Sequence, residues 1–511
     1  MLIYNATFVL FVVVLFVVLA AFALSGLLER QGRRRMENST LLTENTQGLN
    51  YFPKFVANRG LVCYVATLLL VSAIFLNHVL PFQFVVFGFV SVFVFFSYST
   101  SLSQSWRKFA PQLFTKKLFS TALAIRIIYV VFIYFYYVEM TGEPFAYFAG
   151  DEKFYYGMGS LWRLYGLDEF LSEMREFVPF SDSGYSWWLA IEYQLMGVNV
   201  LPTHLLKCLI DAFSCVLLYN LADRNFGDAA ARMTAIFYML LPNAWYYCGV
   251  TLKETEMFFL VMLFAERSDM VLRSPKITLK EMILPLMCII IMFTFRTAMG
   301  GVMFAAMVGA LILSSSKQMQ AWKKVLYGSL FAVWMFLTVG VEIVQETRDL
   351  WEGRAQNQSV GYEWRSETNA YAKYATATVF APLIFTIPFS SMVNVIGQEN
   401  QMMLNGANFI KNIMSGFTIF AILLLITRGK WREHVLPLAL TCGYLVVLVF
   451  SNFAHSERFH FPVLGLEMMF AAYGITQMTN KHKRWFNIWT IVICVANVLW
   501  ALIKLKGRGL A

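Results

Sequence analysis

Apolar runs of about 20 residues recur along the whole chain, and no other feature restricts the possible folds as strongly. A helix needs roughly 20 mostly apolar residues to cross a bilayer. Charged residues make up 14% of the 511 residues, whereas ordinary soluble domains carry about a quarter. The sequence therefore predicts an all-α polytopic membrane protein with about 13 to 14 transmembrane helices.

Basic clusters between the apolar runs orient the chain, because loops rich in Lys and Arg stay in the cytoplasm. "ERQGRRR" (29–35) and "SWRKFAPQLFTKK" (105–117) therefore place residues 139–199 on the external side. A second large external segment, 345–411, includes an apolar stretch with two prolines that we expect to be re-entrant or interfacial. We predict four parts: a three-span N-terminal extension (1–117), a core with the first external loop (118–344), the second external segment (345–411) and C-terminal spans (412–511).

Several function classes find no support in the sequence. The net charge of +10 is explained by the basic loops, so it does not indicate nucleic-acid binding. The seven cysteines are scattered without a CxxC spacing, so neither a disulfide framework nor a zinc site is indicated. No G-x-x-x-x-G-K-[ST] loop is present, so an ATP-driven pump is not indicated either.

Ionisable residues gather at the predicted external ends of the spans, where placing charge is costly and usually functional. "YFAGDEKFYYGMGSLW" (147–162) carries two adjacent carboxylates, and "GVTLKETEMFF" (249–259) and "FAHSERFHFP" (453–462) add both signs of charge. The candidate residues of a shared external site are Asp151, Glu152, Lys253, Glu254, Arg296, Glu457, Arg458 and His460. Each alone has a simpler explanation: solvated loop acids, a helix-start pair favoured by the helix dipole, or an arginine reaching for headgroups.

A polar site on one side of the membrane suits an enzyme that acts on a lipid-linked, anionic substrate. Lys253, Arg296 and Arg458 would hold a phosphate, and one carboxylate would deprotonate an acceptor hydroxyl. Two histidines in "HSERFH" are too weak a pattern to indicate a metal, so no metal ligands are predicted.

The region from about 118 to 275 resembles the polyprenyl-phosphate-dependent glycosyltransferases of the GT-C superfamily, in particular the aminoarabinose-transferase and protein O-mannosyltransferase-like group. "GDEKFYYGMGSLW" after a span is similar to that group's external D-E-x-x-Y segment. The order of aromatic helix, span, basic turn with "FG", and span with Pro in 184–249 matches as well. The start of "GVTLKETEMFF" and the later "SERFHFPVLGLEMMFAAYGI" are also similar to family spans.

This resemblance implies a GT-C-like fold and a role for each candidate residue. Asp151 looks like the general base, with Glu152 beside it in the catalytic pair. Lys253, Glu254, Arg296 and Arg458 look like donor or phosphate contacts, and Tyr155, Glu457 and His460 like acceptor or secondary contacts.

The implied reaction is inverting transfer of a sugar from a polyprenyl-phosphate donor to a lipid, glycan or protein acceptor. No cofactor is required, although a divalent metal near the acid pair would be compatible with the chemistry. The implied location is the bacterial inner (cytoplasmic) membrane, with the site on its external, periplasmic face. Two alternatives remain: an O-antigen-type polymerase, whose paired arginines would be found among Arg348, Arg354 and Arg365, and a lipid-linked-sugar flippase or other transporter.

Overall fold

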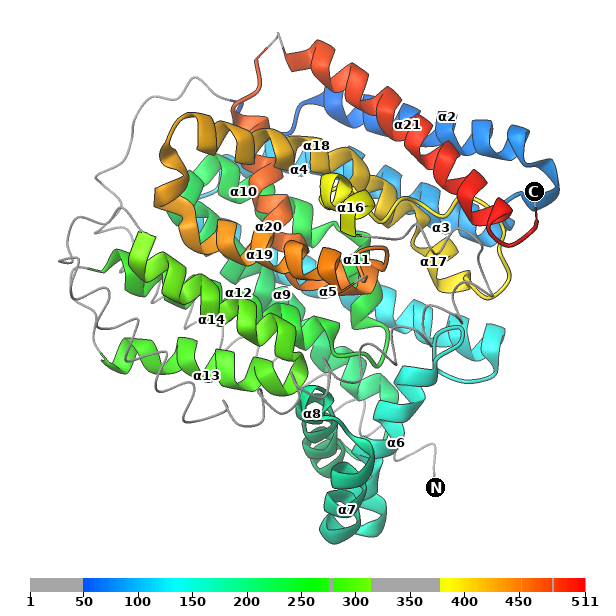
Figure 1. Ribbon diagram of the computed structural model, residues 1–511, viewed down its shortest axis with the longest axis vertical. Helices are drawn as coiled ribbons and strands as arrows, with labels where there is room; N and C mark the ends of the chain where they lie inside the picture. Colours follow the sequence, from blue (N-terminus) through cyan, green and yellow to red (C-terminus); the bar gives the residue numbers. More distant parts are fainter. Residues whose placement is uncertain (1–48, 275–278, 314–376, 452, 480–481, 511) are drawn as a thin grey trace.

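The computed structural model describes residues 49–274, 279–313, 377–451, 453–479 and 482–510. Apart from one isolated bridge between Val79 and Val393, these residues form helices, turns and loops. Most helices lie in one bundle, and α6, α7 and α8 project from one end of it (Figure 1). The all-helical prediction is confirmed. The runs predicted within 1–48 and 314–376 lie outside the described residues.

Most of the long helices follow the apolar runs of the sequence. In the first half they are α2 (Lys54–Ile74), α3 (Phe82–Phe93), α4 (Ser99–Trp106), α5 (Pro111–Thr141), α6 (Gly150–Tyr165), α7 (Leu167–Phe177), α8 (Phe180–Met196), α9 (Val200–Phe226), α10 (Asp228–Met239) and α11 (Pro242–Cys248). In the second half they are α12 (Glu254–Arg273), α13 (Leu279–Phe295), α14 (Thr297–Leu313), α16 (Ala377–Phe380), α17 (Glu399–Met403), α18 (Asn405–Thr427), α19 (Val435–Phe450), α20 (Glu457–Thr476) and α21 (His482–Lys506).

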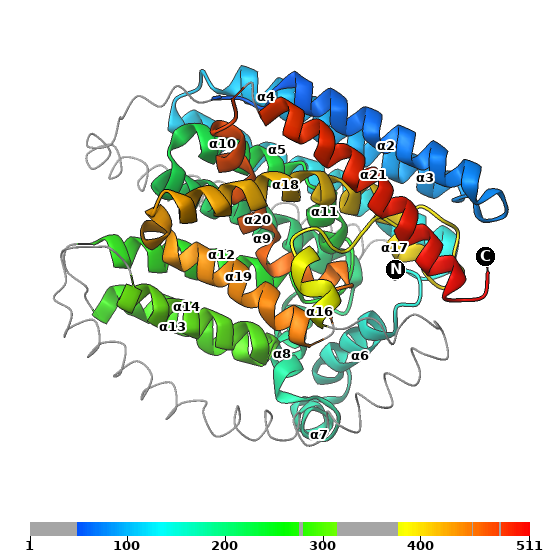
Figure 2. The ribbon, with the colours of Figure 1, turned by 45° about the horizontal axis from the view of Figure 1, so that its top comes forward.

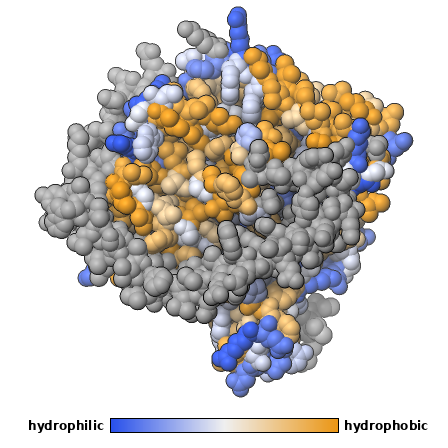
Figure 3. All heavy atoms as spheres, viewed as in Figure 1, coloured by the Kyte–Doolittle hydropathy of each residue, from blue (hydrophilic) through white to orange (hydrophobic). Residues whose placement is uncertain are grey.

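Seven of the described helical segments are long and apolar enough to cross a membrane. They are Lys54–Ile74, Phe82–Trp106, Pro111–Thr141, Val200–Phe226, Asn405–Thr427, Lys430–Phe450 and His482–Lys506. The bundle shows a largely apolar surface in Figure 3, whereas the projecting tip near α7 is hydrophilic. The chain is thus an integral membrane protein, and the total of about 13 to 14 spans stays a prediction.

The segment 139–199, which the sequence predicts to be external, contains α6, α7 and α8. The preceding span α5 ends at Gly142, whose φ of 79° lies in the left-handed region that glycine adopts easily. None of the three following helices is among the seven candidate spans. Helix α8 packs against α6 and α13 and so connects the projecting part to the bundle.

A buried ion pair joins α5, which leads into this segment, to α9. Arg126 on α5 pairs through Nε with the Asp211 carboxylate on α9, and both side chains are fully buried. The Tyr238 hydroxyl on α10 donates to the other oxygen of Asp211 at 2.5 Å. An unpaired charge inside a bilayer would be costly, so this contact requires α5, α9 and α10 to pack together.

The N-terminal helices pack directly on the C-terminal ones. Helix α2 runs beside α21 in both ribbon views (Figures 1 and 2), and α3 packs against α18. The amide of Asn405 on α18 accepts from the Tyr64 hydroxyl at 2.6 Å and donates to the carbonyl of Phe84 at 2.8 Å. The described part of the predicted N-terminal extension therefore belongs to the same bundle.

Two glycines allow α3 and α18 to approach closely. A Cβ at Gly406 would lie 2.4 Å from the carbonyl oxygen of Gly88, a backbone atom that cannot rotate away. We therefore expect Gly406→Ala to lower the free energy of unfolding by about 1 to 3 kcal/mol through overpacking. The matched control is Gly301→Ala in α14, where a Cβ would meet nothing within 4 Å. Thermal unfolding in detergent checks both variants, and equal midpoints would contradict the expectation.

Residues 377–396 contain two prolines and form no long helix in the described structure. A short helix, α16, leads through a turn into an extended segment. The backbone amide of Asn394 donates to the carbonyl of His78 at 2.9 Å, and that of Ser390 donates to the Asn497 side chain at 2.8 Å. These contacts hold the segment against α21 and the loop before α3.

Candidate functional site

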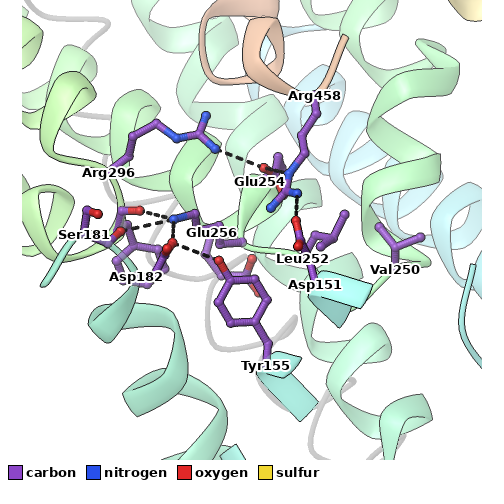
Figure 4. A network of polar contacts seen from close by, with 12 residues as sticks. Asp151, Tyr155, Ser181, Asp182, Val250, Leu252, Glu254, Glu256, Arg296 and Arg458 are labelled. Atoms are coloured by element: carbon purple, nitrogen blue, oxygen red, sulfur yellow. Dashed lines mark hydrogen bonds and ion pairs between the residues drawn. The ribbon is translucent and has the colours of Figure 1, made fainter. Parts of the chain in front are cut away.

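Four of the predicted site residues form one chain of ion pairs at one end of the bundle (Figure 4). Asp151 lies in the first turn of α6, Glu254 begins α12, Arg296 separates α13 from α14, and Arg458 lies in the first turn of α20. Acidic side chains are favoured at helix N-termini by the helix dipole, which suits Asp151 and Glu254. Segments far apart in the sequence therefore bring both signs of charge to one place.

Arg458 is the centre of this chain. Its Nη1 pairs with the Asp151 carboxylate, and its Nε donates to Glu254 Oε1 at 2.5 Å. The two acids differ strongly in burial, since the side chain of Asp151 is 66% exposed and that of Glu254 is fully buried. Glu254 thus orients the guanidinium from inside, while Asp151 lies where a substrate can reach it.

Arg296 approaches the same buried carboxylate from the other side. Its Nη2 lies 3.4 Å from Glu254 Oε1, and its Nη1 donates to the Tyr444 hydroxyl at 3.1 Å. The guanidinium carbon lies 4.5 Å from the centre of the Phe459 ring, a cation–π distance. One buried carboxylate therefore holds two arginines. With Asp151 the chain of ion pairs contains two acids and two arginines and is balanced in charge, so Arg458 can bind an anionic ligand most strongly when Asp151 is neutralised.

Lys253 makes a separate contact with a residue that the sequence analysis missed. Its ammonium pairs with Asp182 on α8 and donates to the carbonyls of Ser181 at 3.1 Å and Phe295 at 2.5 Å. Tyr155, a predicted secondary contact, donates to Asp182 Oδ1 at 2.9 Å. All three donors of Lys253 are thereby used, so in this structure it joins α8 to α12 and α13.

Burial and charge shape the ionisation of this pair. Burial and the nearby Arg296 lower the pKa of Lys253 to about 8, against the opposite effect of Asp182. Burial would raise the pKa of Asp182, but the Lys253 ammonium overrides it and holds that pKa below its ordinary value. The only sequence signal for Asp182 is an acid at the start of an aromatic-rich helix.

Glu152 is buried, with 3% of its surface exposed, unlike its neighbour Asp151. Its Oε2 accepts from the backbone amide of Thr251 at 2.7 Å, and its Oε1 from that of Ala146 at 3.2 Å. The predicted catalytic pair therefore divides into an exposed carboxylate and a buried one that binds backbone.

The other two predicted residues lie on α20 but outside the chain of ion pairs. His460 interacts through Nδ1 with the Lys411 ammonium at 2.7 Å and through Nε2 with the carbonyl of Ala454 at 2.7 Å. Glu457 precedes Arg458 and interacts electrostatically with Lys504 and Lys411 as well as with Arg458. Within the described residues, no three His, Cys, Asp or Glu side chains are arranged to hold a metal ion.

This arrangement is suited to phosphate chemistry with a hydroxyl nucleophile. The planar fork of a guanidinium matches the oxygens of a phosphate group. An accessible carboxylate within reach can accept a proton from a hydroxyl. Asp151 beside Arg458 supplies both functions at one point.

Comparison with known proteins agrees with this chemistry. Residues 180–505 match the family model described as the Alg9-like mannosyltransferase family. The matched region includes Asp182, Lys253, Glu254, Arg296 and Arg458, whereas Asp151 and Glu152 precede it. No curated protein matches the chain.

Proposed function

Because the chain belongs to the Alg9-like mannosyltransferase family, we propose that it transfers mannose from a polyprenyl-phosphate donor to a glycan acceptor at the Asp151–Arg458 site. Membership makes it a membrane glycosyltransferase of the GT-C type, as the sequence predicted. The single observation that supports this site is the chain of ion pairs from Asp151 through Arg458 and Glu254 to Arg296.

In the proposed reaction, the acceptor hydroxyl oxygen attacks the anomeric carbon of the donor sugar. The bond from that carbon to the phosphate oxygen breaks, and the phosphate leaves with the electron pair. Direct displacement inverts the anomeric configuration. The hydroxyl proton passes to Asp151, so the step needs neither a nucleotide nor ATP.

Arg458 couples the two events of this step, proton transfer to Asp151 and departure of the phosphate. While Asp151 is ionised, it competes with the substrate phosphate for the Arg458 guanidinium. Proton uptake neutralises Asp151 and releases that guanidinium just as the leaving phosphate gains negative charge. Stabilising charge that develops only in the transition state is the most effective use of such a cation. Arg296, held by Glu254 and Tyr444, supplies a second positive group nearby.

The finer sequence predictions remain part of this proposal. The resemblance to aminoarabinose transferases and protein O-mannosyltransferases concerns residues 118–275, which the family match overlaps only from residue 180. The matched family favours mannose as the sugar and a dolichyl-type lipid in the donor. The arginines that would support a polymerase, Arg348, Arg354 and Arg365, lie outside the described residues.

The experiment that tests the proposed function is a donor comparison with the purified full chain in lipid nanodiscs. We expect transfer of radiolabelled mannose from a polyprenyl-phosphate donor to a mannose-terminated glycan, with little transfer from the corresponding glucose or aminoarabinose donors. GDP-mannose serves as the soluble-donor control, and we expect the protein not to transfer mannose from it. Preference for another sugar would contradict the mannose assignment, and efficient use of GDP-mannose would contradict the lipid-phosphate donor.

A further inference from the structure

We propose that Glu152 is a positioning residue that fastens the start of α6, which carries Asp151, to the turn before α12 and thereby sets where Asp151 meets the acceptor. This inference rests on the proposed function of Asp151. Two adjacent acids that look equivalent in the sequence then have different roles: Asp151 contacts the substrate, and Glu152 accepts from backbone amides.

The two hydrogen bonds of Glu152 join parts of the chain that are distant in sequence. Ala146 lies in the loop that follows α5, and Thr251 lies in the turn between α11 and α12, 99 residues after Glu152. Each carboxylate oxygen accepts from one amide, so the side chain bridges the two segments. A charged acceptor makes stronger hydrogen bonds than a neutral one.

The turn that Glu152 holds is itself anchored from α9. Lys207 donates to the carbonyls of Val250, at 2.9 Å, and Leu252, and its ammonium lies 3.5 Å from Glu256. His204 Nε2 lies 3.1 Å from the Thr251 hydroxyl. The bundle therefore offers Glu152 a fixed point of attachment.

These contacts close a ring around the site. The turn continues directly into Lys253 and Glu254, Glu254 holds Arg458, and Arg458 pairs with Asp151. Glu152 follows Asp151 in the chain and returns to the turn through Thr251. If the bond between Glu152 and Thr251 opens, the start of α6 loses its direct hydrogen bond to the turn, and the Asp151 side chain keeps its exposed contact to Arg458.

The preceding residues show that this loop is held against its own backbone preferences. Phe148 has a φ of 51°, which a bulky side chain rarely adopts, and its side chain is 75% exposed. Next to it, the Tyr147 carbonyl accepts from Asn400 at 2.7 Å, and the Tyr147 hydroxyl lies 3.0 Å from that of Tyr136. Strained positions persist only where neighbouring contacts fix the chain, and they concentrate at functional sites.

The surroundings of Glu152 change its pKa, and this change has a measurable consequence. The charged and titratable groups facing its carboxylate are Lys207 on α9, Arg458 on α20, Tyr137 on α5 and Tyr246 on α11. Burial raises the pKa of Glu152 to about 7, opposed by the hydrogen bonds from Thr251 and Ala146. Protonation below that pH places a proton on one oxygen and so weakens that oxygen as an acceptor for its amide.

The sign of the pH effect distinguishes positioning from simple stabilisation. Because the pKa of Glu152 is higher in the folded protein than its ordinary value, folding favours its protonated form, and this group's contribution to stability decreases as pH rises toward about 7. The folded protein is thus less stable when Glu152 is ionised, although the ionised carboxylate is the form that makes both backbone contacts. We expect kcat to rise with pH over the range in which this contribution to stability falls.

The test compares Glu152→Gln with wild type in the mannose-transfer assay from about pH 5.5 to 8.5. At high pH we expect kcat of the variant to fall about 10²-fold, the size of effect that a misplacement near 1 Å produces, with KM for the donor little changed. Because the amide mimics the protonated acid, the kcat values of wild type and variant should converge at low pH. Wild type alone should show kcat rising through about pH 7.

The matched control is Glu143→Gln, the same chemical change in the loop that precedes α6. Glu143 is half-exposed and pairs with Lys153 at 2.5 Å, a surface contact that contributes little. If Glu152→Gln behaves like this control, or raises KM without lowering kcat, the positioning role is overturned. The wild-type pH profile decides the matter if the variant does not fold. Failure of the proposed function would show differently, as absence of mannose transfer by wild type, and failure of the role of Asp151 as full activity of Asp151→Asn.

Discussion

Asp151→Asn is expected to lower kcat for mannose transfer about 10²- to 10⁴-fold, the range that a positioned general base contributes. Asparagine has almost the same shape, and its carbonyl oxygen can still accept from Arg458, so the loop should keep its position. It cannot take the proton of the acceptor hydroxyl. KM for the lipid-linked donor should change little, because the donor contacts proposed for Arg296 and Arg458 remain.

The measurement is steady-state transfer at saturating donor and acceptor, with thermal unfolding recorded in parallel. Asp168→Asn, an exposed acid in the first turn of α7, is the control and should keep full activity. Undiminished transfer by Asp151→Asn would remove Asp151 from the reaction. A matching fall in the unfolding midpoint would assign the loss to folding and contradict a catalytic role.

The helical architecture could be predicted because membrane insertion depends on the local sequence. The apolar runs in α5, α9 and α21 identify candidate spans without knowledge of their neighbours. The bundle's internal arrangement could not be predicted in this way. The contact between Gly88 and Gly406 depends on two small residues more than 300 positions apart, and nothing in either segment specifies its partner.

The candidate site was partly predictable for a related reason. Asp151, Glu254, Arg296 and Arg458 are charges at the ends of apolar runs, so topology alone suggests that they lie at one level. Topology does not say which charges touch.

The roles of Lys253 and Glu152 show this limit. Lys253 was expected to bind phosphate, but Ser181, Asp182 and Phe295 occupy its donors in the structure. The partners of Glu152 are backbone amides, which every residue carries and no sequence pattern reveals.

Arg126→Met is the second change for which we expect a large effect, here on stability. It removes the guanidinium from a fully buried pair and leaves the Asp211 carboxylate without its counter-ion. Breaking such a pair on one side costs about 3 to 5 kcal/mol. Tyr238 still donates to Asp211 at 2.5 Å, so one hydrogen bond remains to the stranded acid. The loss should appear as a lower unfolding midpoint in detergent.

The double variant Arg126→Met/Asp211→Leu separates two contributions to the free energy of unfolding: that of the ion pair itself and that of leaving one buried charge unpaired. Replacing both partners by apolar residues of similar volume is often neutral, so the double variant should recover most of the stability that the single variant loses. A double variant no more stable than Arg126→Met would contradict this account. It would mean that the contact of Arg126 with the carbonyl of Met239, and not the charge on Asp211, holds α5 in place. Recovery would instead identify charge neutrality as the requirement. The orientation of α5, and with it the starting point of the loop that leads to Asp151, would then follow largely from apolar packing against α9 and α10.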